Sequence, residues 1–322
     1  MSMQPLFRTF HEAIKLKRFS ENAELIEKRD RVLTRIRENI RGPKGERMTF
    51  QPFDQGSYAM GTGIKPLGGD YDIDVGIEFS FSYRDYTPVE VKGWVYEAIK
   101  THTKRVEWRR PCLTVYYQQE REPIYHVDLA IMARDPGTGG LRLAVGKQHS
   151  AADQQEWQAD DRKGFMAAVE NQFTGEDAEQ FRRVIRYLKR WKDQHFSLEG
   201  SAAPTGLSLT VAAYKWFRPM ARFAGEGREY DDLNATSALV DAMINGFGST
   251  WNPSTARNTP RLSLLFPKAP HDDVFKWMTH QQMVEFHARL LTLNRLLASA
   301  RSTGTTAPLR QAFGDEFPAK EV

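Results

Sequence analysis

The sequence predicts an α+β protein, in which a small mixed sheet is joined to a helical C-terminal half. Three observations predict this class. Residues 7–41 carry apolar side chains at helical spacing, residues 70–134 change to alternating and β-branched segments, and the chain after residue 160 is helical almost to its end. We therefore expect two domains, a core unit at 1–160 that includes the N-terminal helix, and a helical domain at 161–322.

The elements follow in a definite order. Residues 7–41 form one long helix, or two helices with a break near residues 20–22, and TFQPFDQGSY is a short strand that runs into a turn. Three strand patterns follow, which are YDIDVGIEFSF, RVEWRRPCLTVYYQ and IYHVDLAIMAR, and one helical pattern, VEVKGWVYEAIKTHT, lies between the first two. DPGTGG is a turn. The later helices are RKGFMAAVENQF, AEQFRRVIRYLKRWKDQH, GLSLTVAAYKWFRPMARF, LNATSALVDAMINGF and HQQMVEFHARLLTLNRLLASA.

Composition narrows the classes of function. The chain has 322 residues, 40% of them hydrophobic, and a net charge of +4 from 45 basic and 41 acidic side chains, so only the placement of charge can indicate a partner. The single cysteine, Cys112, excludes an internal disulfide and is expected to be a buried, inert thiol. No apolar run has membrane-spanning length and the N-terminus lacks the apolar core of a signal peptide, so we expect a cytoplasmic protein without a membrane partner.

Three aspartates alternate in the stretch DQGSYAMGTGIKPLGGDYDIDVG at 54–76. The two-residue repeat of a strand sends Asp70, Asp72 and Asp74 to one face, where they repel one another unless cations sit there. A third strand carboxylate, Asp128, lies in IYHVDLAIM and comes alongside if the two strands are close. Carboxylates of this kind hold pairs of Mg²⁺ ions that flank a phosphoryl transfer. The alternative is a solvated edge strand; Asp70, nearest the turn, is taken as exposed or supporting.

The segment QGSYAMGTG precedes these aspartates. Glycines let a backbone approach a ligand closely, and a Gly-Ser at the start of a helical turn offers N–H groups and a hydroxyl to an anion. Gln55, Gly56 and Ser57 are therefore candidates to hold the β- and γ-phosphates of a nucleotide, although a lone Gly-Ser is usually a simple turn.

A basic helix is the third element. Val184, Ile185, Leu188 and Trp191 form its expected buried stripe. Its positive residues, Arg182, Arg186 and Lys189, form either a solvated basic face or, beside a triphosphate site, a source of charge neutralisation through Lys189.

Taken together, QGSYAMGTGIKPLGGDYDIDVG, YHVDLAIM, RVIRYLKRWKD and GLSLTVAAY resemble the bacterial cyclic-oligonucleotide synthases, the CBASS nucleotidyltransferases of anti-phage defence, which are relatives of animal cyclic GMP-AMP synthase. The resemblance covers most of the chain. It implies a polymerase-β-like nucleotidyltransferase core with a long N-terminal helix, a helical C-terminal lobe, and an active site in the cleft between them.

The resemblance also implies residue roles. Asp72 and Asp74 match the metal-binding pair of the family and Asp128 matches its third carboxylate, with two Mg²⁺ ions for which Mn²⁺ can substitute. Gln55, Gly56 and Ser57 match the phosphate-contacting motif, and Lys189 matches the lysine that reaches the donor triphosphate. A further phosphate contact falls on Thr205, Gly206 or Ser208, and Ser208 is our candidate. One cysteine cannot build the zinc-containing insertion of the animal enzyme, so no double-stranded DNA activator is expected.

The expected function is therefore the joining of ATP, and of other NTPs, into a cyclic di- or trinucleotide second messenger with release of pyrophosphate. Some members of the family need a HORMA-domain activator protein, which remains a possible partner. One rival is a template-independent nucleotidyltransferase that extends an RNA end or modifies a protein. The other is a catalytically silent nucleotide-binding module, although such a module would be expected to have lost one of the three carboxylates.

Overall fold

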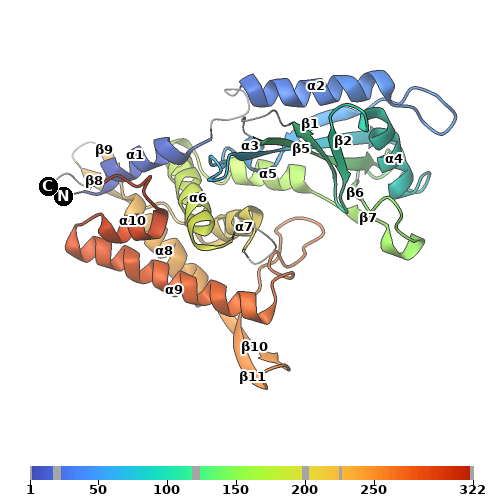
Figure 1. Ribbon diagram of the computed structural model, residues 1–322. Coiled ribbons are helices and arrows are strands. Elements are labelled where there is room, and N and C mark those ends of the chain that lie inside the picture. The colour runs from blue at the N-terminus through green and yellow to red at the C-terminus, as the bar shows by residue number, and fades with distance from the viewer. Residues whose placement is uncertain (1, 17–22, 118–123, 198–202, 225–226, 320–322) are drawn as a thin grey trace.

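A computed structural model of the chain describes residues 2–16, 23–117, 124–197, 203–224 and 227–319. Figure 1 shows a sheet with its helices on one side of the molecule and a group of packed helices on the other, joined near α3 (Gly56–Ala59) and α5 (Arg162–Glu170). The predicted succession of a mixed sheet and a helical half is thus present.

The sheet has seven strands in the described part of the chain. Its main path runs β1-β2-β5-β4-β3, and β6 and β7 extend it from β5. Only β2 and β5 pair in parallel; the other pairs are antiparallel. The strands are β1 (Gln51–Gln55), β2 (Asp70–Ser80), β3 (Arg105–Trp108), β4 (Leu113–Tyr117), β5 (Ile124–Arg134), β6 (Leu141–Val145) and β7 (Glu156–Ala159).

One face of the sheet is covered by α2 (Ala23–Asn39) and α4 (Pro88–Ile99). The alternation expected for β2 is present, because Ile73, Val75 and Ile77 are fully buried in the core that the sheet shares with these helices. Asp72 and Asp74, which have the opposite parity, therefore face away from this core. A segment read as one strand pattern, residues 105–118, forms two strands, because its backbone turns at Arg109–Cys112.

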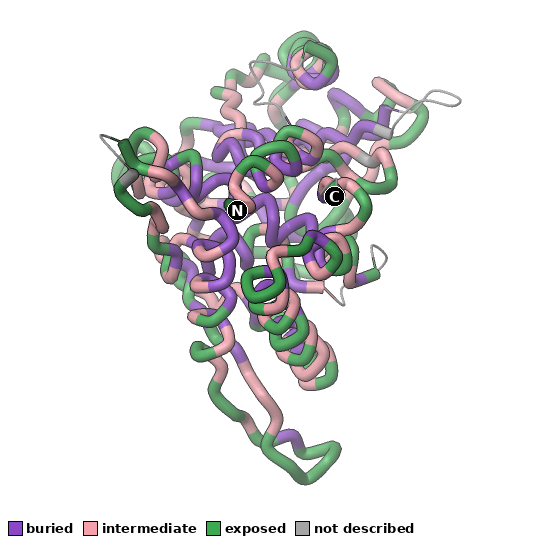
Figure 2. Tube along the Cα trace, turned by 90° about the vertical axis from the view of Figure 1, so that its left-hand side faces the viewer, coloured by how far each residue is buried: buried purple, intermediate pink, exposed green. Residues whose placement is uncertain are grey.

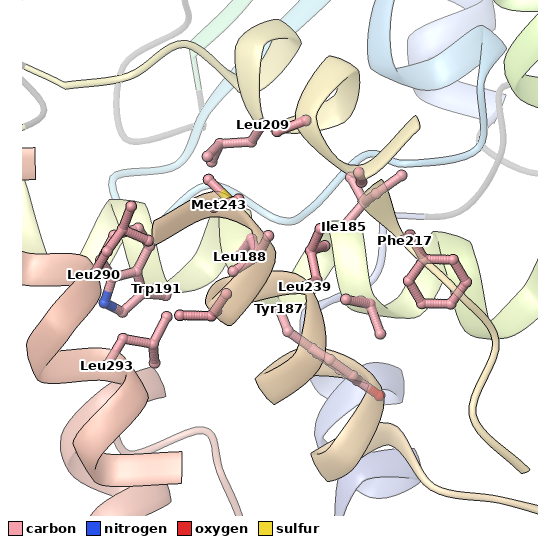
Figure 3. Close-up of a cluster of buried hydrophobic side chains, with 14 of the residues drawn as sticks. Ile185, Tyr187, Leu188, Trp191, Leu209, Phe217, Leu239, Met243, Leu290 and Leu293 are labelled. Carbon is pink, nitrogen blue, oxygen red and sulfur yellow. The ribbon is translucent and has the colours of Figure 1, made fainter. Parts of the chain in front are cut away.

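The helical half is built around α6 (Gly175–His195), whose apolar stripe is buried as expected. Figure 3 shows Ile185, Leu188 and Trp191 of this helix among side chains of the neighbouring helices. The other helices are α7 (Gly206–Trp216), α8 (Asp232–Asn245), α9 (His280–Thr303) and α10 (Ala307–Phe313).

Two hairpins interrupt the helices, at β8–β9 (Ala221–Ala224 and Gly227–Tyr230) and at β10–β11 (Phe247–Asn252 and Arg257–Leu262). The sequence pattern did not indicate them. The second hairpin projects from the body of the molecule, and its trace is largely exposed (Figures 1 and 2).

The N-terminal helix requires a correction to the expected domain boundary. Helix α1 (Gln4–Ile14) does not belong to the sheet unit: Phe7, Phe10 and Ile14 are fully buried in the core of the helical half. The rings of Phe7 and Phe10 contact Phe313 and Phe317 near the C-terminus, with centroids 5.1–6.3 Å apart. The first helix is therefore an additional member of the helical half, and the break expected near residues 20–22 lies outside the described residues.

Two smaller expectations concern chemistry away from the cleft. Cys112 is buried, and burial raises the pKa of its thiol to about 12, which is consistent with an inert side chain. Within the described residues, none of the helices combines the length and the apolar character needed to cross a membrane.

Candidate active site

The parallel pair β2–β5 brings the acidic residues together. Asp74 and Asp128 are direct partners in the register of these strands, and Asp72 is the partner of His126. Residues that are partners in a parallel pair lie side by side on the same face, so Asp128 is the neighbour of the other two aspartates across the strand boundary. The strands that carry the aspartates, β2 and β5, are therefore neighbours, as the predicted acidic site requires. The side chain of Asp70 lies outside the described part of the structure.

Negative charge accumulates on this face. Burial, together with the neighbouring carboxylates of Asp128 and Asp72, raises the pKa of Asp74 to about 6. Burial also raises the pKa of Asp128, although a hydrogen bond from Thr114 Oγ1 to Asp128 Oδ1 (2.5 Å) opposes this effect. Asp72 is more exposed, and its Oδ1 lies 3.1 Å from His126 Nδ1. The face therefore carries more negative charge than its surroundings neutralise.

These carboxylates fit a hard divalent cation in their chemistry. All three offer oxygen ligands, and a cation would relieve the repulsion that raises the pKa of Asp74. The side chains do not form a complete metal site in this structure, however. Among the described residues, no three acidic, histidine or cysteine side chains lie close enough together to hold a metal ion.

The Gly-Ser turn lies directly against Asp74. Gln55 ends β1 and is the antiparallel partner of Asp74, and Gly56 and Ser57 begin α3. Gly56 has φ +73°, and a Cβ atom there would lie 1.9 Å from Asp74 Oδ2, so both the backbone and the neighbouring carboxylate require glycine. The side chain of Gln55 is buried, and its Oε1 has no hydrogen-bond partner among the described atoms.

A cavity of about 410 Å³ opens between the two halves at this place. The sheet half contributes Gln55, Gly56, Ser57, Asp72 and Asp74 to its walls. Other wall residues come from the helical half, including Arg162, Phe165, Lys189, Lys192, Gly206 and Phe266. Asp128 is not among the residues that line the cavity. A cleft of this size and polarity can take a nucleotide.

Lys189 reaches the cavity from α6. Its side chain is buried, and its Nζ donates to the carbonyl oxygen of Thr62 (3.0 Å) and to Thr62 Oγ1 (3.1 Å). Burial, together with the charges of Arg186 and Lys192, lowers the pKa of Lys189 to about 7. The ammonium group therefore lies beside the Gly-Ser turn, where an anion would restore its usual pKa.

The three candidates at the start of α7 have different surroundings. Thr205 caps the helix by accepting a hydrogen bond from the backbone N–H of Ser208 (3.0 Å). Ser208 is fully buried, and its hydroxyl donates to the carbonyl of Thr205 (2.8 Å). Gly206 lines the cavity, next to Lys189. Gly206 and Leu207, and not Ser208, thus border the cavity at this turn.

The basic residues of α6 are buried: Arg182, Arg186 and Lys189 are each less than 10% exposed. The interpretation of this face as solvated is therefore wrong. Sequence reasoning also missed two basic residues in the cavity wall, Arg162 and Lys192. No local pattern marks them, because the two residues reach the cavity only through the tertiary packing of α5 and α6.

Comparisons with known proteins agree with this geometry. Residues 51–132 match the family model for the nucleotidyltransferase domain of DncV-like cyclic GMP-AMP synthase. The fold is similar to that of the CD-NTase CdnG of Bradyrhizobium diazoefficiens in complex with GTP, at 17% identity and a TM-score of 0.69, over 96% of this chain and 95% of that one.

The fold is also similar to that of Vibrio cholerae DncV, a cyclic AMP-GMP synthase, in complex with nonhydrolysable GTP. Here the identity is 17% and the TM-score 0.59, over 84% of this chain and 70% of that one. A second DncV structure, with the linear intermediate 5′ pppA(3′,5′)pG, has a TM-score of 0.57 at 17% identity, over the same shares of the two chains.

These matches confirm the predicted class. The chain has the α+β fold with a polymerase-β-like nucleotidyltransferase core and a helical C-terminal region, and it is a nucleotidyltransferase that resembles the DncV-like cyclic-oligonucleotide synthases.

Proposed function

We propose that this protein joins NTPs, with ATP as a donor, into a cyclic di- or trinucleotide and releases pyrophosphate. One observation carries the proposal: a single cavity is bordered by the paired carboxylates Asp72 and Asp74, by the Gly56–Ser57 turn and by the Lys189 ammonium. Nucleotidyl transfer needs this combination, because a triphosphate must be held and its charge neutralised next to the reacting phosphorus.

The chain's own residues position the donor. Its triphosphate lies along Gln55, Gly56 and Ser57, where backbone N–H groups and the Ser57 hydroxyl donate to phosphate oxygens. Lys189 supplies positive charge from the opposite wall.

Asp72, Asp74 and Asp128 would hold two divalent ions, Mg²⁺ by the chemistry of the donor set, with Mn²⁺ as a substitute. When bound, such ions stabilise the charge of the phosphates and lower the pKa of the attacking hydroxyl.

In the transfer itself, a ribose hydroxyl of the acceptor nucleotide attacks the α-phosphorus of the donor. A new P–O bond forms, the bond to the β-phosphate bridging oxygen breaks, and pyrophosphate carries away the electron pair. Asp128, the register partner of Asp74, would assist the removal of the hydroxyl proton. A second transfer of the same kind within the linear product closes the ring.

The biological setting belongs to the same proposal. Cyclic oligonucleotides of this class act as second messengers in anti-phage defence, and we place the enzyme there, in the cytoplasm. Other NTPs besides ATP are candidate substrates, and a HORMA-domain protein is a candidate activator. Activation by double-stranded DNA is not part of the proposal.

The test is mass spectrometry of the products formed from all four NTPs with Mg²⁺ or Mn²⁺. We expect phosphatase-resistant cyclic products from the wild type, none from the double variant Asp72→Asn/Asp74→Asn, and wild-type products from a control, Asp153→Asn, at an exposed acidic residue outside the cavity wall.

Other outcomes would support the rivals. Label transferred from ATP to added RNA or protein, without small cyclic products, would favour an end-extending or protein-modifying enzyme. Tight ATP binding without any product, in the presence of the candidate activator, would favour a silent module. The burial of Arg182 and Arg186 supports cyclisation over RNA extension, because these two arginines of α6 are not available to a polynucleotide.

A further inference from the structure

The loop that follows the Gly-Ser turn is bound by cations of α6. Arg186 donates from Nη2 to the carbonyl of Gly61 (2.5 Å) and from Nε to that of Gly63 (3.1 Å). Lys189 Nζ donates to the carbonyl between them, that of Thr62 (3.0 Å), and Arg190 Nη2 donates to that of Lys65 (2.8 Å). Three side chains of one helix thus bind four carbonyls within residues 61–65, which we call the phosphate loop.

Arg186 also links the phosphate loop to the first helix. Its Nη1 lies 2.9 Å from His11 Nε2. Burial and the charge of Arg186 lower the pKa of His11 to about 4, so the imidazole is neutral near pH 7 and Nε2 accepts the hydrogen bond. The end of α1 meets the same loop through its backbone: Leu16 N donates to Gly63 O (3.1 Å), and Lys65 N donates to Ile14 O (2.8 Å).

The position of the phosphate loop determines that of the Gly-Ser turn. The backbone N–H of Thr62 donates to the carbonyl of Ser57 (2.8 Å), so a shift of the loop moves Ser57 with it. Thr62 also holds the Lys189 ammonium through its carbonyl and hydroxyl. Thr62 is therefore hydrogen-bonded to both groups that would face a bound triphosphate, the Ser57 turn and Lys189. Arg186 binds the carbonyls of the residues on either side of Thr62.

We propose that Arg186 is a positioning residue of the nucleotide site. Arg186 holds the phosphate loop so that Ser57 and Lys189 can bind the same triphosphate, and His11 of α1 orients the guanidinium of Arg186. This inference rests on the proposed function. The planar fork of an arginine suits the task, because it can bridge two carbonyls and still reach a third acceptor, whereas a lysine ammonium has no such fixed geometry.

The first test compares Arg186→Gln and Arg186→Lys with Arg182→Gln. Arg182 lies one turn earlier on α6 and pairs with Glu179 of the same helix, so it is a matched control. We expect hydrogen exchange of the loop amides at 61–65 to quicken about tenfold or more in both Arg186 variants and not in the control. The KM for ATP should rise about 10- to 100-fold, with a smaller change in kcat, because loss of a supporting partner loosens the site that it orients.

Two outcomes would overturn the inference: loop exchange in Arg186→Gln equal to that of Arg182→Gln, or faster exchange with an unchanged KM.

If Arg186→Gln does not fold, His11→Leu and His11→Gln make the same comparison, because leucine removes the acceptor for Nη1 and glutamine supplies one. We expect faster loop exchange and a higher KM in His11→Leu, with partial recovery in His11→Gln; two variants that both behave as wild type would contradict the linkage.

The two proposals fail separately. A wild-type protein that binds no fluorescent ATP analogue and makes no product, with Mn²⁺ and the candidate activator present, contradicts the proposed function. The exchange measurement needs no nucleotide and still decides whether Arg186 holds the loop.

Discussion

Replacement of Gly56 by alanine should separate stability from activity. Gly56 has φ +73°, and an added Cβ would lie 1.9 Å from Asp74 Oδ2, 2.7 Å from its Cγ and 3.0 Å from its Cβ. The backbone term for a left-handed residue with a side chain is about 1–2 kcal/mol. Crowding adds about 1–3 kcal/mol. Rotation of the Asp74 carboxylate away from Gly56 relieves most of this crowding but removes the carboxylate from its place on the acidic face.

Gly139→Ala is the matched control. Gly139 has φ +69°, and no atom lies within 4 Å of a Cβ added there, so this variant carries the backbone term alone. Urea unfolding should give a loss of about 1–2 kcal/mol for Gly139→Ala and about 2–5 kcal/mol for Gly56→Ala. Pyrophosphate release should fall about 100-fold or more only in Gly56→Ala, since a misplacement of about 1 Å in a reacting group has this effect.

The reasoning would be refuted by a Gly56→Ala protein that is folded and releases pyrophosphate within about threefold of the wild-type rate. Such a result would mean that the position of the Asp74 carboxylate beside Gly56 has no bearing on the reaction. A loss of activity in Gly139→Ala of the same size would likewise show that the backbone strain, and not the contact with Asp74, is responsible.

Three further predictions follow from the charges of the cavity. The affinity for an ATP analogue should weaken as the pH rises from about 6 to about 8, because the pKa of Lys189 in the free protein is lowered to about 7 and the ammonium form binds phosphate. Lys189→Met should abolish this pH dependence. A pH dependence that persists in the variant would show that another group is responsible. In EDTA at neutral pH, Asp74→Asn should increase the free energy of unfolding by up to about 3 kcal/mol, because the raised pKa of Asp74 means that its charged form is disfavoured in the folded state. With Mg²⁺ or Mn²⁺ present, the same variant should show no turnover. A variant less stable than the wild type in EDTA would contradict this. Thr114→Val should lower stability by about 1–3 kcal/mol and reduce kcat, because Asp128 loses a buried donor; unchanged thermal unfolding and kcat would show that the bond has no effect.

The arrangement of α6 gives a physical reason for what sequence reasoning misjudged. Helical periodicity predicted its apolar stripe at Ile185, Leu188 and Trp191, because the spacing of apolar residues along a helix is a local property. The same periodicity left the arginines on a nominally solvated face. Arg186 and Lys189 are instead buried against residues 61–65, more than 120 positions away in the chain, whose carbonyls need donors once they leave regular secondary structure.

The sequence by itself determined the alternation of β2, the placement of its aspartates opposite a buried face, and the glycine next to them. Each depends on neighbouring residues and on the two-residue repeat of a strand. Only the tertiary structure decided that Asp128 is the register partner of Asp74, that Arg162 and Lys192 enter the cavity wall, and that α1 packs with the helical half. These features depend on contacts between distant segments, whose geometry local periodicity does not specify.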